Sequence, residues 1–122
     1  MKSSLPSPTK AQLERWRVMQ ELGCIACQLN GVTGVPADIH HVLSGGRRIS
    51  HTATLALCSW HHRSVKPDTK LTTVRFKEMY GPALDANPKE FQQRYGTQQE
   101  LLEIQEALIQ KYYEVTSHEQ EQ

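Results

Sequence analysis

The sequence predicts a small α+β domain. One β-hairpin and the helix after it form its core, flanked by an N-terminal helix and by C-terminal helices. Three observations predict this fold. Two short runs of β-branched and apolar residues lie on either side of a glycine-bearing loop. Helix caps and a helical apolar period recur near both ends of the chain. Two pairs of cysteine and histidine residues stand next to the hairpin.

Length and composition favour one domain over residues 1–122. Apolar residues make up 38% of the chain and the mean hydropathy is -0.58. No apolar run approaches the roughly 20 residues of a membrane-spanning helix. The first ten residues, MKSSLPSPTK, lack the apolar centre of a signal peptide. We therefore expect a cytoplasmic protein with no membrane partner.

The N-terminal part is expected to be a flexible segment followed by a helix. Residues 1–9 are rich in serine and proline, which is typical of a frayed end. Thr9 and Gln12 have the spacing of a capping box, and Gly23 is a typical helix stop. Apolar residues recur at helical spacing between them, so the sequence predicts an amphipathic helix over residues 10–22.

Residues 23–66 are expected to form the core. The part before residue 37 shows no helical period. Residues 37–43 (ADIHHVL) and 52–57 (TATLAL) are predicted strands, and the SGGRR loop between them predicts a hairpin. A helix then begins near Trp60 and ends before Pro67, because proline cannot continue it.

Residues 72–115 are expected to be helical, and residues 116–122 to be a polar tail. Three segments carry helix caps. They are Thr72 or Thr73 before a helix reaching Tyr80, Asn87-Pro88 before a helix that Gly96 ends, and Thr97 with Glu100 before a helix from Gln98 to about Glu114. The last helix has an apolar stripe, which is typical of a packing face.

The net charge of +1 hides an asymmetry along the chain. From residue 41 to residue 77 there are seven basic residues and one acid, whereas from residue 78 onward there are three basic residues and nine acids. A basic middle favours a polyanionic partner such as nucleic acid.

The cysteines predict a structural metal site. Their number, three, argues against a disulfide framework in a reducing compartment. Cys24 and Cys27 form a C-x-x-C pair, and Cys58 and His61 form a C-x-x-H pair. A lone C-x-x-C pair is also typical of redox proteins, but two pairs with matching spacers favour a tetrahedral Zn²⁺. Such an ion would crosslink the end of the first helix to the end of the hairpin.

Two pairs of adjacent histidines predict a second centre. Neighbouring side chains diverge on a helix or strand, so if His61 binds zinc, His62 points elsewhere. The candidate partners lie on the first strand, where His40 and His41 project to opposite faces.

The pattern resembles the HNH, or ββα-metal, nuclease family. The residues that carry the resemblance are, in order, Ile39-His40-His41, Ser44-Gly45-Gly46-Arg47-Arg48 and Leu57-Cys58-Ser59-Trp60-His61-His62. The resemblance implies a zinc-stapled ββα-metal core that hydrolyses phosphodiester bonds of DNA. It implies that His40 and His62 bind a catalytic divalent metal, Mg²⁺ or Mn²⁺, and that His41 is the general base.

One position departs from the common pattern. Ala53 stands where an asparagine is usual, five residues before Cys58. His51 is the nearest polar substitute, and we expect it to orient the base or to contact phosphate.

Within the HNH group, the chain is similar to the phage and prophage recombination enhancement function (Ref) nucleases. The similar segments are Gly23-Cys24-Ile25-Ala26-Cys27, His51 seven residues before Cys58, and Phe91 to Thr97 followed by Glu100-Leu101-Leu102. The resemblance implies a phage- or prophage-encoded DNA endonuclease in a bacterial cytoplasm. It also implies a RecA filament as a partner.

Four basic residues flank the expected cleft and suit contacts with DNA phosphates: Arg47, Arg48, Arg63 and Lys66. Trp16 and Trp60 are expected to pack in the core rather than to stack on bases.

Two other functions remain open. The first is a non-catalytic zinc module that binds DNA or a protein partner, which Ala53 favours. The second is a redox or metal-buffering protein, for which Cys24 and Cys27 would be reactive thiols.

Overall fold

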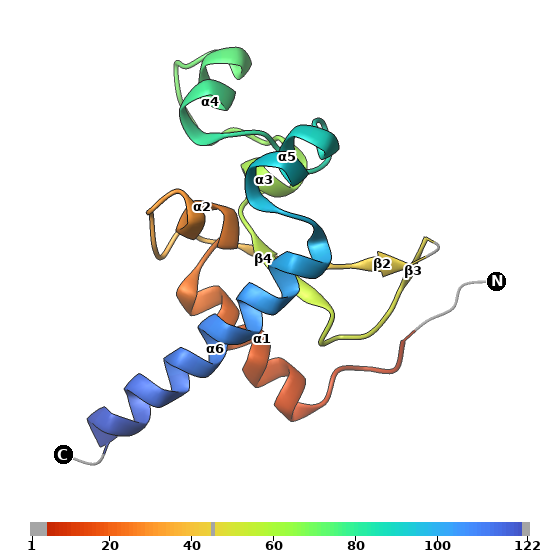
Figure 1. Cartoon of the computed structure of the whole chain (residues 1–122), viewed down its shortest axis with the longest axis vertical. Coiled ribbons are helices and arrows are strands. Elements are labelled where there is room, and N and C mark those ends of the chain that lie inside the picture. The colour runs from red at the N-terminus through yellow and green to blue at the C-terminus, as the bar shows by residue number, and fades with distance from the viewer. Residues whose placement is uncertain (1–4, 45, 121–122) are drawn as a thin grey trace.

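The computed structural model describes residues 5–44 and 46–120, with side chains described to residue 116. Parts of the expected flexible N-terminus (1–4), hairpin loop (Gly45) and polar tail (121–122) lie outside the described residues. The elements are α1 (Lys10–Leu22), α2 (Ile25–Leu29), β1 (Asp38–His41), β2 (Leu43–Ser44), β3 (Arg47–Arg48), β4 (Thr54–Leu57), α3 (Ser59–Arg63), α4 (Thr73–Tyr80), α5 (Pro88–Tyr95) and α6 (Gln98–Gln120). The predicted α+β class is confirmed (Figure 1).

The predicted hairpin is present, but its strands are shorter than expected. β1 pairs antiparallel with β4, with His40 opposite Leu55 and His41 opposite Thr54. The segment expected to be one strand from 37 to 43 splits, because β2 leaves this pair and forms its own two-residue ladder with β3. The β2–β3 tip stands out from the body of the molecule at the right of Figure 1.

The capped helices begin and end close to their predicted positions. The Thr9 side chain and the Gln12 side chain form the capping box of α1, and Gly23 ends this helix with a φ of 90°. α4 and α5 have the predicted bounds, whereas α6 continues to Gln120, beyond the expected end near residue 114.

The segment before residue 37 contains a helix that the sequence did not predict. α2 is one short turn, and its N-cap is Cys24, whose sulfur accepts a hydrogen bond from the Cys27 backbone N–H at 3.5 Å. Five residues are too few to show a helical period, and local capping forms this turn.

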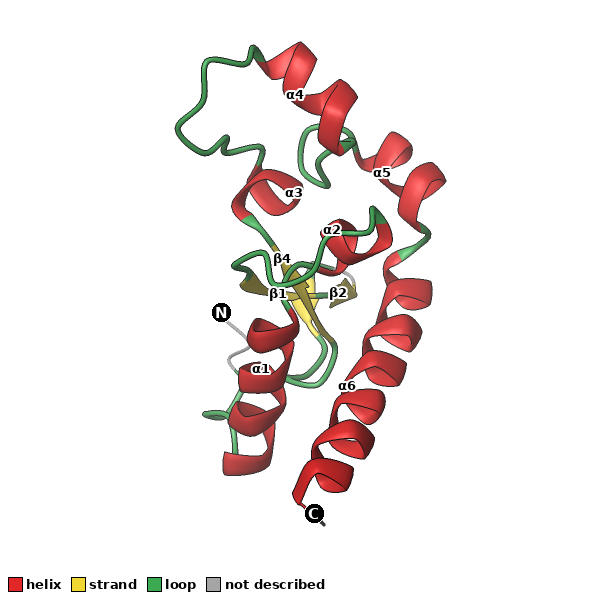
Figure 2. Ribbon diagram, turned by 90° about the vertical axis from the view of Figure 1, so that its left-hand side faces the viewer, coloured by secondary structure: helices red, strands yellow, loops and turns green. Residues whose placement is uncertain are grey.

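The hairpin lies between two groups of helices. α1 and α6 contact each other and pack against β4, while α3, α4 and α5 lie beyond the C-terminal end of this strand (Figures 1 and 2). All four residues of β4 are buried. Gln105 of α6 is fully buried and accepts a hydrogen bond from the Ala56 N–H of this strand at 3.2 Å. This hydrogen bond fixes β4 against α6.

Among the residues described, no helix combines the length and the apolar character that crossing a membrane requires.

Candidate metal centres

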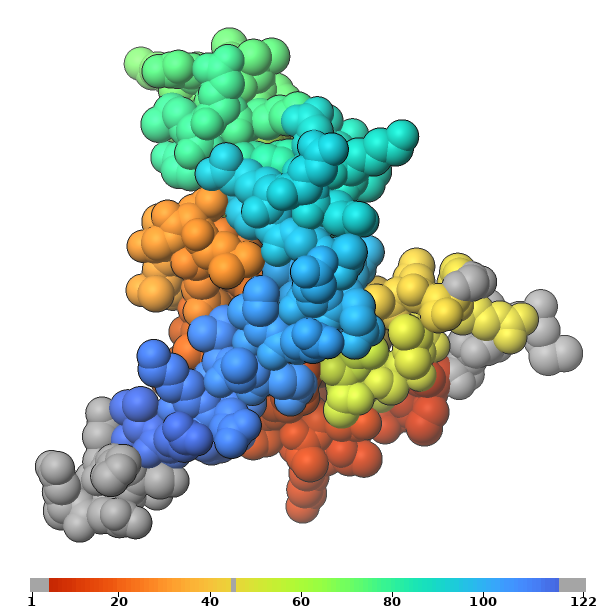
Figure 3. All heavy atoms as spheres, viewed as in Figure 1, coloured from red at the N-terminus to blue at the C-terminus, as the bar shows by residue number. Residues whose placement is uncertain are grey.

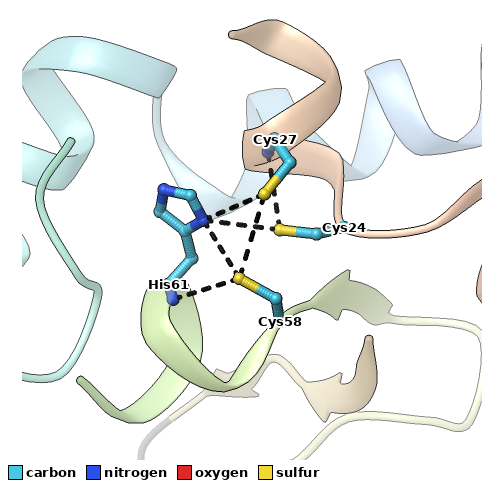
Figure 4. Close-up of side chains that lie close together, drawn as sticks. All are labelled: Cys24, Cys27, Cys58 and His61. Atoms are coloured by element: carbon cyan, nitrogen blue, oxygen red, sulfur yellow. Dashed lines mark hydrogen bonds between the residues drawn. The ribbon is translucent and has the colours of Figure 1, made fainter. Parts of the chain in front are cut away.

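Three cysteines and one histidine converge where α2 meets α3 (Figure 4). Cys24 and Cys27 come from the N-cap and the first turn of α2, while Cys58 and His61 come from the N-cap and the first turn of α3. One ligand atom from each of the four lies within 4.8 Å of the others. The two segments predicted to share one ion are therefore adjacent in space.

The distances within this cluster match a tetrahedral ion. His61 Nδ1 lies 3.6, 3.5 and 3.3 Å from the sulfur atoms of Cys24, Cys27 and Cys58. The Cys27 and Cys58 sulfur atoms are 3.9 Å apart. Tetrahedral zinc bonds of about 2.3 Å to sulfur and about 2.0 Å to nitrogen separate two sulfurs by about 3.8 Å and a sulfur from a nitrogen by about 3.5 Å.

The other ring nitrogen of His61 is held by the helical C-terminal part. His61 Nε2 lies 2.8 Å from the Tyr80 carbonyl oxygen and 3.2 Å from the Tyr95 hydroxyl. A carbonyl oxygen only accepts, so Nε2 carries a proton, and Nδ1, which faces the three sulfurs, is the nitrogen that can bind a metal once it has lost its own proton. This is the arrangement found around metal-ligating histidines.

Hydrogen bonds within the cluster shift the pKa values of three of its members. Hydrogen bonds from Cys24 and Cys27 hold the pKa of the Cys58 thiol well below its usual range, whereas hydrogen bonds to Cys24 and Cys58, with burial, raise the pKa of Cys27. Burial lowers the pKa of His61, but its hydrogen bonds to Cys24 and Cys58 outweigh burial and raise it to about 10. A divalent cation displaces such protons, so this group can hold a metal ion such as zinc.

The second histidine of α3 turns away from this cluster. His62 Nε2 lies 3.2 Å from Nδ1 of His40 on β1, and the two rings meet edge to face with centroids 4.9 Å apart. The expected divergence of His61 and His62 is therefore present, as is the expected approach of His40 to His62.

The far nitrogens of this pair face polar side chains. His40 Nε2 lies 2.9 Å from Gln98 Oε1, at the start of α6. His62 Nδ1 is buried and has no hydrogen-bond partner within the described part of the chain. The nearest carboxylate oxygen, Asp38 Oδ2, is 3.8 Å away from it.

His41 points the other way and meets His51. His41 Nε2 lies 3.0 Å from His51 Nδ1, and His51 Nε2 lies 2.7 Å from the Pro6 carbonyl oxygen. Because that carbonyl only accepts, His51 Nε2 carries the proton and His51 Nδ1 accepts from His41 Nε2–H. His41 Nδ1 is then left with a lone pair.

Trp16 of α1 packs against this pair. Its indole Nε1–H donates to the His51 carbonyl oxygen at 2.9 Å, and its ring lies edge to face with His41 and His51, with centroid distances of 5.6 and 5.3 Å. Its spacing on α1 predicts only a core residue, so this contact with the histidines could not be predicted from the sequence.

Burial affects the protonation of the two β1 histidines. It lowers the pKa of His40, and the neighbouring His62 lowers it further, although the hydrogen bond to Gln98 opposes this shift. Burial also lowers the pKa of His41, assisted by Arg48 and His51. Both imidazoles are therefore predominantly neutral at pH 7, the form that accepts a proton or binds a metal.

The four predicted phosphate-binding residues are in different surroundings. Arg47 and Arg48 are exposed on β3. Arg63 makes a salt bridge with Asp38 at 3.0 Å, and Lys66 Nζ donates to the Leu71 carbonyl oxygen at 3.0 Å.

Comparison with known families agrees with the resemblance in the sequence. A family model described as recombination enhancement, RecA-dependent nuclease matches residues 8–110. The match runs from the cap of α1 into α6, so it includes the cysteine cluster and both histidine pairs. The chain therefore belongs to the family of RecA-dependent nucleases that act in recombination enhancement.

Proposed function

We propose that the protein is a metal-dependent DNA endonuclease of the HNH type, which hydrolyses phosphodiester bonds in a RecA-dependent manner. The observation that carries the proposal is the divergence of the adjacent histidines. His61 faces three sulfur atoms, whereas His62 Nε2 lies 3.2 Å from His40 Nδ1. A structural zinc at the first group and a catalytic metal at the second account for both.

The spacing of His40 and His62 suits a shared divalent ion. Two nitrogens bound at about 2.1 Å with an angle between 90° and 110° lie about 3.0 to 3.4 Å apart. When bound, Mg²⁺ or Mn²⁺ polarises the phosphate and stabilises the leaving 3′ oxygen. Because imidazole is a softer ligand than carboxylate, we expect Mn²⁺ to bind more tightly than Mg²⁺.

In this proposal His41 is the general base. Its Nδ1 lone pair takes a proton from water as the water oxygen attacks phosphorus and the bond to the 3′ oxygen breaks. The leaving oxygen takes its proton from solvent. His51 orients the base by accepting the His41 Nε2–H, and is itself held by the Pro6 carbonyl.

We further propose a role for each part of the chain. Residues 23–66 form the nuclease core of a single domain, and residues 72–115 support it. Four residues contact DNA phosphates: Arg47, Arg48, Arg63 and Lys66. The family description supports a RecA filament as the partner. From the resemblance in the sequence alone, we also propose a phage- or prophage-encoded protein acting in a bacterial cytoplasm.

A cleavage assay tests this function. The parent protein is incubated with single- and double-stranded DNA, with and without a RecA filament, in Mg²⁺ or Mn²⁺. We expect cutting only with the divalent metal and RecA, and a loss of at least about 100-fold in His41→Ala, the loss typical of a missing general base. Zinc content should stay at one ion per chain. If His41→Ala cuts normally, the assignment of the base is wrong.

A non-catalytic zinc module is the second candidate, and the absence of asparagine at position 53 favours it. For such a module, the parent binds DNA or a protein partner without cutting. It also holds one zinc and takes up no second ion.

A further inference from the structure

The first residue of α6 lies against the proposed catalytic centre. Thr97 caps this helix: its hydroxyl accepts the Glu100 N–H at 3.1 Å, and the Glu100 side chain accepts the Thr97 N–H at 3.0 Å. This box fixes where the helix begins and so where the side chain of Gln98 starts. Gln98 Oε1 reaches within 2.9 Å of His40 Nε2.

The amide oxygen of Gln98 selects one tautomer of His40. An oxygen acceptor at Nε2 requires the proton to be on Nε2, which leaves the Nδ1 lone pair facing His62. The same logic holds at His61, where the Tyr80 carbonyl accepts from Nε2 and Nδ1 faces the sulfurs. Both histidines thus present Nδ1 while an oxygen holds the opposite nitrogen.

A shared cation suits the surroundings of His62 better than a hydrogen bond between two neutral imidazoles does. In a pair of neutral rings, His62 Nε2 donates to His40 Nδ1, so His62 Nδ1 is a bare lone pair. That atom is buried, has no hydrogen-bond partner among the described residues and faces the Asp38 carboxylate at 3.8 Å. With a cation between the rings, the His62 proton is on Nδ1 instead and faces the carboxylate, which is favourable.

We propose that Gln98 is a positioning residue of the second centre, so that α6 completes a metal site whose ligands come from β1 and α3. The inference rests on the proposed function, since it assumes a divalent ion between His40 and His62. It extends that function, because neither the HNH resemblance nor the hairpin requires a residue from the C-terminal helix.

Three variants test the role of Gln98. Gln98→Leu keeps the side-chain size but removes the acceptor, while Gln98→Glu keeps an acceptor and also suits a helix N-terminus. Gln99→Leu is the matched control, because Gln99 is the exposed neighbour on the same helix. Mn²⁺ binding to each zinc-loaded protein is measured by calorimetry without DNA, and cleavage by single turnover.

We expect Gln98→Leu to weaken Mn²⁺ binding by about 10- to 100-fold, the loss typical of removing a partner of a ligating histidine. Cleavage at limiting Mn²⁺ should fall in parallel and recover at saturating Mn²⁺. Gln98→Glu should bind within about 3-fold of the parent, and Gln99→Leu should be unchanged. Zinc content should stay at one per chain in all of them. If Gln98→Leu does not fold, Gln98→Asn, too short to reach His40, should show the same loss.

The results separate the two proposals. If the parent binds no Mn²⁺ beyond its zinc, the proposed function fails, and this inference fails with it. If the parent binds Mn²⁺ and the variants lacking the acceptor bind it equally well, only the role of Gln98 is wrong. If Gln98→Glu is as weak as Gln98→Leu, the acceptor does not set the tautomer and the inference is overturned.

Discussion

Two pairs of adjacent histidines are the centre of the proposed chemistry, and each pair is divided between two environments. His40 and His62 meet on one side of the hairpin, while His41 meets His51 on another and His61 faces the cysteines. The division follows from geometry, because consecutive side chains on a strand or in a helical turn point in different directions. Two histidines that are adjacent in the sequence can therefore belong to two separate sites within a small core.

Two substitutions of His51 test whether this residue orients His41. His51→Gln can replace both hydrogen bonds, since a glutamine oxygen can accept from His41 Nε2–H while its amide donates to the Pro6 carbonyl. His51→Ala removes both and lets the base move. We expect about a 100-fold lower single-turnover rate in His51→Ala, because the His41 imidazole is no longer held in its reactive position. In His51→Gln we expect a rate within about 10-fold of the parent.

Zinc content and melting temperature serve as controls for these two variants. An equal loss of rate in both, or none in either, would contradict an orienting role for His51.

The sequence indicates the cysteines and histidines of the candidate sites, but not the residues that hydrogen-bond to the histidines. The cysteine spacings and the doubled histidines are local patterns, so they can be interpreted without a structure. Pro6 and Gln98 could not be predicted. They reach His51 and His40 across 45 and 58 residues of chain, and nothing in the sequence around Pro6 or Gln98 indicates such contacts.

The short elements are held in place by turns that only particular residues can form. α1 ends at Gly23, where the chain passes close to a following segment and the Cys24 N–H donates to the Val35 carbonyl at 2.9 Å. A Cβ atom at Gly23 would lie 2.6 Å from the Val35 nitrogen. This close approach brings Cys24, the first cysteine of the cluster, into position.

Comparing Gly23→Ala with Gly31→Ala separates the effect of the close packing against Val35 from the effect of backbone strain alone. Both glycines have positive φ, 90° and 91°, but a Cβ at Gly31 meets nothing within 4 Å. Gly31→Ala should cost about 1–3 kcal/mol of unfolding free energy through backbone strain. Gly23→Ala should cost about 1–3 kcal/mol more through overpacking.

Urea denaturation of the zinc-loaded proteins gives both values. Gly23→Ala should also release zinc more readily to a chelator. Equal stability and equal zinc retention in the two variants would show that the packing at Gly23 does not matter.

The elements that were predicted well are those with strong local signals. Capping residues predict the starts of α1, α4, α5 and α6, and glycines predict the ends of α1 and α5. α2 was missed because it is short, and the β2–β3 ladder was missed because it depends on pairing across the loop rather than on strand propensity. α6 extends beyond its predicted end, because no glycine or proline follows residue 114 to terminate the helix.

Across the whole molecule, charge is separated along the chain. The basic middle includes the β2–β3 tip, which stands out at the right of Figure 3 in yellow, while the acid-rich α6 leads away toward the lower left in blue. Arg47 and Arg48 on this tip are exposed. The separation favours an orientation in which the tip and the histidine pairs, rather than α6, face the DNA.

Replacing Arg47 and Arg48 together by alanine tests this orientation. In a His41→Ala background, which prevents cutting, duplex binding is followed by fluorescence anisotropy over a range of salt concentrations. If each arginine neutralises one phosphate, the slope of log K against log salt should become less steep by about 2. The loss should not depend on the DNA sequence.

Arg17→Ala is the control for the loss of a positive charge away from the tip, because Arg17 lies on α1 and is paired with Glu14 and Glu21. A similar change of slope in Arg17→Ala, or none in the double variant, would contradict a DNA-facing role for the tip.

Anomalous diffraction from one crystal grown with Zn²⁺ and soaked in Mn²⁺ can decide whether neighbouring imidazoles serve two different ions. We expect a zinc peak within bonding distance, about 2.0–2.3 Å, of His61 Nδ1 and the three cysteine sulfurs. A separate manganese peak should lie between His40 Nδ1 and His62 Nε2, within bonding distance of both. A single ion at the cysteine cluster, with no manganese between His40 and His62 at millimolar Mn²⁺, would show that the adjacent histidines do not serve two ions.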